Sequence, residues 1–312
     1  MNATRTNRLL WAAFAVSTIF GGLNALGVRY TVVELPPMWG ATLRLVPSTL
    51  ILFGLVFFLK LPLPKGKALL GSILFGLLNF GATMPLLYYS IKIIPPGMVQ
   101  VILALVPLFT LLFAIAHRQE KFRWNALAGA LLAIGGIALV FGEQIRDHIP
   151  LFTLLAVVLA AVSFAEATVI ARNFPKSHPI TTSAIAMATG AVVVFAISLL
   201  KGEPRALPAM MNTWIALIYL IVFGSVIMFL LVLYILKQWT ASAISYQFVL
   251  LPFVSLTVSG LLGIEKLTPI LLGGGSLVLL GVFVGVLFTP RKRTTEAKPT
   301  VRIDASPCLE CE

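Results

Sequence analysis

Charged side chains are scarce in this chain of 312 residues, and acidic ones are the scarcest. Asp and Glu number 11 against 23 Lys and Arg, and together they make up 11% of the residues, where a soluble domain has about 25%. This deficit and a mean hydropathy of +1.00 exclude both a soluble domain and a disordered chain. The net charge of +12 lies mostly in short gaps between apolar runs and in the tail, which indicates membrane loops rather than nucleic-acid binding.

Residues that carry enzyme chemistry are equally few. The two cysteines form one C-x-x-C pair, Cys308 and Cys311, with no second pair of zinc ligands and no βαβ context for redox chemistry. The three histidines, His117, His148 and His178, lie at the edges of apolar runs. Because no phosphate-binding loop and no deep cluster of nucleophile, base or metal ligands is encoded, we expect no enzyme activity, no metal and no cofactor.

Apolar runs fill most of the chain, and ten of them reach about the 20 residues that a helix needs to cross a bilayer. A membrane barrel would alternate apolar and polar residues, whereas the run 50–59 contains no polar side chain. The sequence therefore predicts an all-α integral membrane protein with ten transmembrane helices. The predicted spans are 9–28, 38–59, 68–90, 97–116, 124–142, 150–171, 180–200, 213–236, 242–263 and 268–288.

Lys and Arg concentrate in residues 1–8, in every second connection and in the basic tail 289–312. By the positive-inside rule this asymmetry places both termini in the cytoplasm, with the chain in the cell (inner) membrane. The first span has a basic flank like a signal peptide, but it is long for one and lacks a clear A-x-A cleavage site, so we expect it to be retained.

The chain also resembles itself at one fixed offset. The matches include Pro, Glu, Lys and Gly, which do not interchange as aliphatic residues do. They divide the chain into a first five-helix repeat, 9–142, a connection, 143–149, and a second repeat, 150–288. The aligned pairs are Tyr89 with Tyr234, Lys92 with Lys237, Pro107 with Pro252, Leu111 with Leu256, Glu120 with Glu265, Gly129 with Gly274 and Gly136 with Gly281.

An odd number of spans in each repeat makes the second repeat enter the membrane from the opposite side. Such inverted repeats are typical of secondary transporters, whose substrate site lies near the midplane between the halves. A duplicated scaffold that transports nothing is the alternative.

The segment 242–285, with Pro252, the run Gly263 to Thr268 and the glycines after it, resembles the C-terminal half-signature of the EamA family of the drug/metabolite transporter superfamily. The first half is similar but weaker from Gly97 to Gly142. The resemblance implies a ten-helix carrier, usually an exporter of amino acids or other small metabolites. It also implies a cavity lined by spans 1, 3, 4, 6, 8 and 9.

Polar side chains within the spans fall mainly on those that the resemblance assigns to the cavity. Amides are the better candidates for substrate binding, because their own helix cannot satisfy all four hydrogen-bonding positions. A hydroxyl, in contrast, is more often bonded to its own helix. The predicted substrate-binding residues are Asn24, Asn79, Tyr89, Gln100, Glu166, Tyr246 and Gln247.

Glu166 is the candidate for ion coupling. It lies about six positions inside the sixth span, at a depth where an ionisable group costs at least about 2.5 kcal/mol. We interpret it as a proton-binding carboxylate or a counter-charge for a cationic substrate, with a contact to the interface or to a basic residue as the alternative. Arg44, in the second span, is interpreted first as an anchor that reaches the interface and second as a substrate contact.

Pro107 and Pro252 occupy equivalent positions, and each should kink its span. We interpret them as gating hinges, with static packing as the alternative. Glycines crowd the fifth and tenth spans, where Gly281 and Gly285 form a GxxxG pair. They hold together either the two halves or two chains of a homodimer.

The predicted function is a secondary transporter that exports a small metabolite, such as an amino acid, by alternating access. The transport is either uncoupled or proton-coupled. The alternatives are an exporter of lipophilic cations, attracted by Glu166 and aromatic residues, and a membrane scaffold without transport. The expected partners are a small-molecule substrate and the lipid bilayer, with no nucleic acid.

Overall fold

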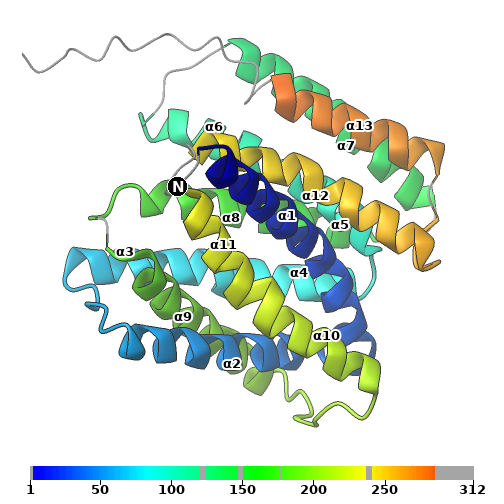
Figure 1. Cartoon of the computed structure of the whole chain (residues 1–312). Helices are drawn as coiled ribbons and strands as arrows, with labels where there is room; N and C mark the ends of the chain where they lie inside the picture. The colour runs from blue at the N-terminus through cyan, green and yellow to red at the C-terminus, as the bar shows by residue number, and fades with distance from the viewer. Residues whose placement is uncertain are drawn as a thin grey trace, which may run out of the picture.

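The computed structural model describes residues 3–119, 124–146, 150–175, 177–236, 241–266 and 268–284, and these are helical apart from short connections, with no strand among them (Figure 1). The first half contains α1 (Ala3–Glu34), α2 (Pro37–Phe58), α3 (Lys67–Gly76), η1 (Leu77–Ala82), α4 (Thr83–Ile91), α5 (Pro96–Leu103), α6 (Val106–Ala116) and α7 (Trp124–Arg146). The second half contains α8 (Leu151–Ala171), α9 (Pro179–Leu200), α10 (Met211–Ile221), η2 (Val222–Ile227), α11 (Met228–Leu236), α12 (Ala241–Leu261) and α13 (Pro269–Val282).

Helices lie on each of the apolar segments expected from the sequence. Within the described ranges, six helical stretches are long and apolar enough to cross a membrane, and four shorter apolar helices accompany them. The six are Arg8–Glu34, Pro37–Phe58, Lys67–Ile91, Pro96–Ala116, Leu151–Ala171 and Pro179–Leu200, and the four are Leu127–Val140, Met211–Ile227, Leu250–Leu261 and Pro269–Val282.

Two helices continue past their expected ends. α1 runs to Glu34 rather than to residue 28, because backbone hydrogen bonds continue until the Pro36–Pro37 pair stops the helix. α7 runs to Arg146, into the connection expected at 143–149. Residues 147–149 and the tail, with its C-x-x-C pair, lie outside the described residues.

The two matched prolines differ in their surroundings. Sequence predicts a kink at both, but the helix around Pro107 is divided, with α5 ending at Leu103 and α6 beginning at Val106. The N–H of Leu105 turns back to the carbonyl of Ile102 (3.0 Å), and Pro107 falls in the first turn of α6, where its missing N–H costs nothing. Pro252, in contrast, lies inside the undivided helix α12.

The sequence does not predict the two π-helical segments, η1 and η2. They lie at the same offset that aligns Tyr89 with Tyr234, so the same irregularity occurs once in each half. Such segments are rare and are frequent at functional sites.

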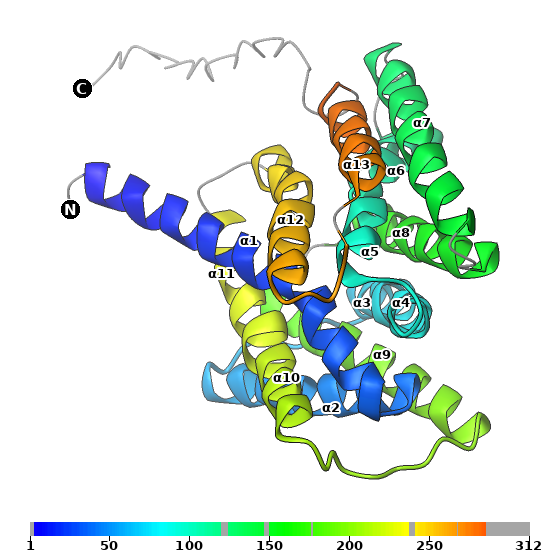
Figure 2. The ribbon, with the colours of Figure 1, turned by 90° about the vertical axis from the view of Figure 1, so that its right-hand side faces the viewer.

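Packing between the helices follows the same repetition. α2 packs against its equivalent α9, and α7 packs against its equivalent α13 (Figures 1 and 2). α1 contacts α10, α11 and α12, while its equivalent α8 contacts α3, α4 and α6. The first helix of each half is therefore surrounded by corresponding neighbours.

Three glutamates join the two halves at one end of the bundle. Glu203 accepts the N–H groups of Met38 and Trp39 (3.4 and 2.8 Å) at the start of α2, so α9 runs antiparallel to α2. Glu34 accepts the N–H groups of Ala209 and Met210 just before α10. Each carboxylate lies where the helix dipole favours negative charge.

Glu265 is the third of these residues and accepts the N–H groups of Gly97 and Met98 (3.0 and 3.1 Å) at the start of α5. It therefore caps a helix of the other half rather than the start of its own. Burial raises the pKa of the Glu265 carboxyl group, and the two N–H donors oppose that rise.

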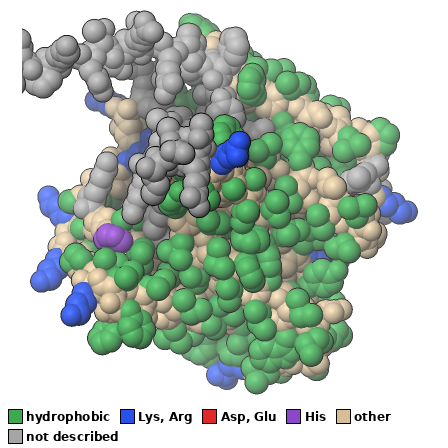
Figure 3. Space-filling model, in the orientation of Figure 1, with side chains coloured by type: hydrophobic (Ala, Val, Ile, Leu, Met, Phe, Trp, Pro, Cys, Tyr) green, Lys and Arg blue, Asp and Glu red, His purple; other side chains and the backbone are tan. Residues whose placement is uncertain are grey.

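The surface of the bundle is predominantly apolar. Figure 3 shows a broad hydrophobic face with most of the visible Lys and Arg near its margins. Among the large apolar side chains, Phe58, Leu200 and Leu261 are more than 80% exposed. An apolar surface of this extent is suited to lipid rather than water.

Close packing of α7 on α13 depends on glycine. A Cβ at Gly136 would lie 2.6 Å from the carbonyl oxygen of Gly274 and 2.8 Å from the backbone nitrogen of Val278. The glycine faces are thus occupied within the chain, which leaves the leucine-rich outer faces of these helices for lipid or for a second chain.

We expect Gly136→Ala to lower the melting temperature of the purified protein by a few degrees. Backbone atoms cannot move aside as a side chain can, so overpacking costs about 1–3 kcal/mol and exceeds the gain of about 1 kcal/mol in helix propensity. The control is Gly273→Ala on the exposed side of α13, where no atom lies within 4 Å of the added methyl group. Equal melting temperatures for the two variants would contradict this account.

Candidate functional site

A cluster of polar side chains surrounds the middle of α1. The carbonyl oxygen of Gly21 accepts a hydrogen bond from Nε2 of Gln100 in α5 (3.4 Å). A Cβ at Gly21 would lie 3.8 Å from Nε2 of Gln247 in α12, so the two glutamines converge on the same turn of α1 from opposite halves. Both are buried, and Nε2 of Gln247 has no hydrogen-bond partner among the described residues.

Asn24 lies one turn further along α1 and faces the second π-helical segment. Its Nδ2 is 3.4 Å from the carbonyl oxygen of Gly224 and 3.5 Å from Sδ of Met228. Gly224 packs closely against this amide, because a Cβ at position 224 would overlap Oδ1 of Asn24 unless the asparagine side chain moved. Asn24, Gln100 and Gln247, which sequence predicts as substrate-binding residues, are therefore brought together on one stretch of α1.

Arg44 of α2 completes this cluster. Its Nε donates to Oγ of Ser225 (3.2 Å), and one terminal nitrogen lies 3.3 Å from Oδ1 of Asn24 and 3.2 Å from the carbonyl oxygen of Gly224. The side chain is only 6% exposed, so it does not reach the interface as the anchor interpretation requires. The fully buried phenol of Tyr88 lies close to the guanidinium of Arg44. Its hydroxyl has no hydrogen-bond partner of good geometry in the described part of the chain.

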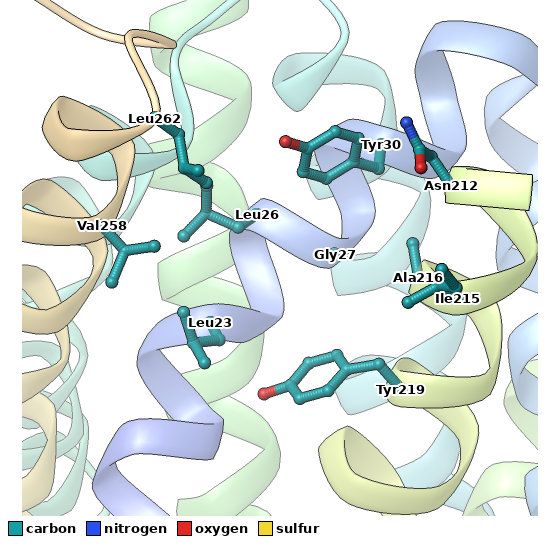
Figure 4. Close-up of a pocket in the computed structure, with 10 residues that line it drawn as sticks. All are labelled: Leu23, Leu26, Gly27, Tyr30, Asn212, Ile215, Ala216, Tyr219, Val258 and Leu262. Carbon is teal, nitrogen blue, oxygen red and sulfur yellow. The ribbon is translucent and has the colours of Figure 1, made fainter.

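A pocket of about 320 Å³ opens between α1, α10 and α12, next to this cluster. Its outer part is lined by residues near the helix ends, including Tyr30, Asn212 and Leu262 (Figure 4). Tyr219 lies deeper, and its hydroxyl donates to the carbonyl oxygen of Phe20 (2.7 Å). Tyr219 thus stands between the pocket and the turn of α1 that carries the polar cluster.

Tyr219 is held by aromatic packing. Its ring stacks on Phe223 (5.9 Å between centroids, 16° between planes) and meets the ring of Phe20 edge-on (6.3 Å). Because Phe20 also contacts Phe223 (5.2 Å), the three rings form an apolar layer from α1 to η2.

Glu166 lies elsewhere, near the other end of the bundle. Its Oε1 is 2.9 Å from Nε2 of His117, and the two side chains are 25% and 34% exposed. The partner is therefore a histidine from the first half rather than the lysine or arginine that the alternative interpretation expects. Nearby, Nε2 of Gln119 donates to Asn173 (2.9 Å), so this contact also joins the two halves.

The remaining predicted residues have other surroundings. Asn79 is buried in η1, and its Oδ1 has no partner among the described atoms. Tyr89 contacts the ring of Phe152 (5.7 Å), and Nζ of Lys201 lies 5.9 Å above it. The backbone of Tyr246 belongs to α12, but its side chain lies outside the described residues.

The sequence led us to interpret Arg44 first as an anchor, and it did not indicate that Tyr219 lines a pocket. The available signal for Arg44 was a cation inside an apolar run with no acidic residue in the same span. Tyr219 carries no such signal, because a tyrosine in an apolar run is as compatible with packing as with a pocket.

An apolar exterior, helices of membrane-spanning length and buried polar side chains define a multi-pass membrane protein with a polar interior. The model of the EamA-like transporter family matches residues 9–142 and, separately, residues 151–287. The chain belongs to this family and carries its unit twice, which confirms the resemblance inferred from the sequence.

Relatives with assigned names are also transporters. The chain is 29% identical over 300 residues to "Uncharacterized inner membrane transporter YedA" of Escherichia coli (strain K12), covering 94% of each chain. It is 25% identical to an "Uncharacterized transporter" of Archaeoglobus fulgidus, covering 88% of this chain and 98% of the relative. A "Probable amino-acid metabolite efflux pump" of Escherichia coli (strain K12) is 24% identical, with 85% and 90% coverage.

One solved structure, titled "Crystal structure of protein", is similar with a TM-score of 0.64 at 17% identity, over 93% of this chain and 100% of the other. At this identity the likeness shows the fold alone.

Proposed function

We propose that this protein is a secondary transporter that exports a small metabolite, such as an amino acid, by alternating access. Its ten helices form two inverted repeats in the inner membrane, with both termini in the cytoplasm. The observation that carries the proposal is the cluster of the buried Gln100, Gln247 and Arg44 with the half-buried Asn24, between the halves of a bundle with an apolar surface. Buried polar groups in a membrane bundle mark substrate pathways, and inverted repeats place such a site at their interface.

Two observations support an amino acid or a similar metabolite as the substrate. The relative named as a probable amino-acid metabolite efflux pump suggests a zwitterionic or acidic metabolite. The buried charge of Arg44 opposes the alternative of lipophilic cations, because like charges repel strongly in a medium of low dielectric constant.

Access to the cluster would alternate between the two ends of the bundle. On one side the pocket lined by Tyr219 approaches the cluster, and on the other the His117–Glu166 contact lies between the halves. The division of the helix at Pro107 and the residue Pro252 inside α12 would act as hinges, and Glu166 would bind the coupling proton. A homodimer would use the outer faces of α7 and α13.

Counterflow in proteoliposomes tests this function. Vesicles loaded with unlabelled leucine or phenylalanine should accumulate the labelled amino acid without ATP, and Asn24→Leu should reduce the rate at least about tenfold. The leucine cannot replace hydrogen bonds that are worth about 0.5–1.5 kcal/mol each and leaves buried groups unpaired.

The matched control is Asn173→Leu, which replaces an exposed asparagine that accepts a hydrogen bond from Gln119 near His117, far from the cluster. It should keep the wild-type rate. Saturable counterflow that is equal in the wild type and in Asn24→Leu would remove the cluster from the pathway, and its absence for every metabolite tried would favour the scaffold.

A further inference from the structure

Arg44 is a cation in the interior of the bundle without an anion beside it in the described ranges. All four glutamates whose side chains are described have other partners. Three bind backbone N–H groups at helix starts, and the fourth binds His117. The guanidinium instead meets one hydroxyl, one amide oxygen and one backbone carbonyl oxygen, all of them neutral.

Those three contacts are long for a charged donor. They measure 3.2–3.3 Å, whereas hydrogen bonds from a cation to a carboxylate are about 2.7–2.9 Å. Arg29 provides the contrast within the same chain, because one of its terminal nitrogens lies 2.8 and 2.6 Å from the carbonyl oxygens of Ile91 and Lys92. That position, at the end of α4, is one where the helix dipole favours a positive charge. Arg29 thus has short contacts to backbone carbonyl oxygens, whereas Arg44 has only long contacts to neutral groups.

Two further side chains of this region lack hydrogen-bond partners among the described residues, and both have N–H or O–H groups to donate. The hydroxyl of Tyr88 can donate as well as accept, and Nε2 of Gln247 in α12, which lies beside Gly21 one turn before Asn24, has two N–H groups and no acceptor among the described residues. An ionised carboxylate only accepts hydrogen bonds, and its two oxygens match the planar fork of a guanidinium. The cluster therefore has the donors and the charge that such a group requires.

We propose that Arg44 binds the carboxylate of the transported substrate, which makes the substrate class small carboxylic acids. This inference rests on the proposed transport function and narrows its cargo. Because Arg44 is the charged side chain that the described residues place in this cluster, we expect binding to depend on the carboxylate of an amino acid and not on its amino group. Acids that lack the amino group bind as amino acids do, and amides do not.

Thermal unfolding of the purified full-length protein tests this with matched triplets of ligands. Each triplet holds an amino acid, the acid that lacks its amino group, and its amide: leucine with 4-methylpentanoate and leucinamide, and phenylalanine with 3-phenylpropanoate and phenylalaninamide. A ligand that binds the folded state raises the melting temperature with concentration. In at least one triplet, both acids should raise it and the amide should not.

Arg44→Met and Arg29→Met form the matched pair of variants. Without ligand, Arg44→Met should melt no lower than the wild type, because it removes an unpaired buried charge together with three weak contacts, and it should lose the response to acids. Arg29→Met should melt lower than the wild type and keep the response. Arg44→Lys keeps the charge but not the fork, so its response should be reduced but present.

Four results would overturn the proposal: no acid of either triplet stabilises the wild type, an amide stabilises it as much as its acid, Arg44→Met keeps the response, or Arg44→Met melts lower than Arg29→Met. If Arg44→Met cannot be purified, the proposal is tested by the thermal unfolding of the wild type with the ligand triplets and by the response of Arg44→Lys to the acids. Stabilisation by acids without counterflow would instead contradict the transport function and leave this inference intact.

Discussion

A membrane-impermeant maleimide added to intact cells should modify Lys201→Cys almost completely and leave Lys65→Cys unmodified. Both positions are exposed, so reactivity depends on the side of the membrane that each faces. Glu203 binds the start of α2, while Leu52 and Val56, near the end of α2, cluster with Ile180 and Ala184 near the start of α9. The two lysines therefore lie at opposite ends of an antiparallel helix pair, about 33 Å long for 22 residues at 1.5 Å each.

The background for this experiment is the full chain with Cys308→Ser and Cys311→Ser, which removes both native thiols. After permeabilisation both engineered cysteines should react, which shows that each is accessible. Reaction of both from the outside of intact cells would place the two connections on one surface. The inverted arrangement and the alternating-access proposal would then both be wrong.

Glu166→Gln should abolish the effect of a pH gradient on transport while leaving counterflow within about twofold of the wild type. If one proton moves per substrate, a gradient of one pH unit supplies about 1.36 kcal/mol, or about a tenfold change in the accumulated substrate. Glutamine has nearly the shape of glutamate, but its side-chain amide does not bind a proton near neutral pH. Counterflow exchanges substrate for substrate and needs no net proton movement.

The measurement is uptake into proteoliposomes with and without an imposed pH gradient. Glu203→Gln is the matched control, because that glutamate is fixed at the other end of the bundle by backbone N–H groups and by Oγ of Ser198 (2.9 Å). It should retain the wild-type response to the gradient. A pH response that survives in Glu166→Gln would remove the residue from coupling and leave its contact with His117 a structural one.

Helix positions and the repeat were accessible from the sequence because both depend on local composition. Apolar runs of membrane length predict where helices lie, and matched Pro and Gly residues reveal the duplication. The division at Ala104–Leu105 and the segments η1 and η2 were not accessible, since they depend on how each helix meets its neighbours. Gly224 illustrates this, because its close approach to the side chain of Asn24 is visible only in the packed structure.

The same distinction applies to the candidate site. Asn24, Gln100 and Gln247 could be selected because an amide inside an apolar helix needs a partner from elsewhere. The depth of Arg44 along its helix does not tell whether the side chain turns toward lipid or toward the other helices. Likewise, the pairing of Glu166 with His117 joins residues from different halves, and no pattern within either span predicts it.

The two halves contact each other through chemically different groups at the two ends of the bundle. At one end, three carboxylates from Glu34, Glu203 and Glu265 hold peptide N–H groups of the opposite half, and a peptide N–H keeps its proton at any physiological pH. At the other end, the contact between the halves joins two side chains, the carboxylate of Glu166 and the imidazole of His117. A rocking motion of the halves would thus break a contact between two side chains at one end of the bundle and contacts with backbone N–H donors at the other.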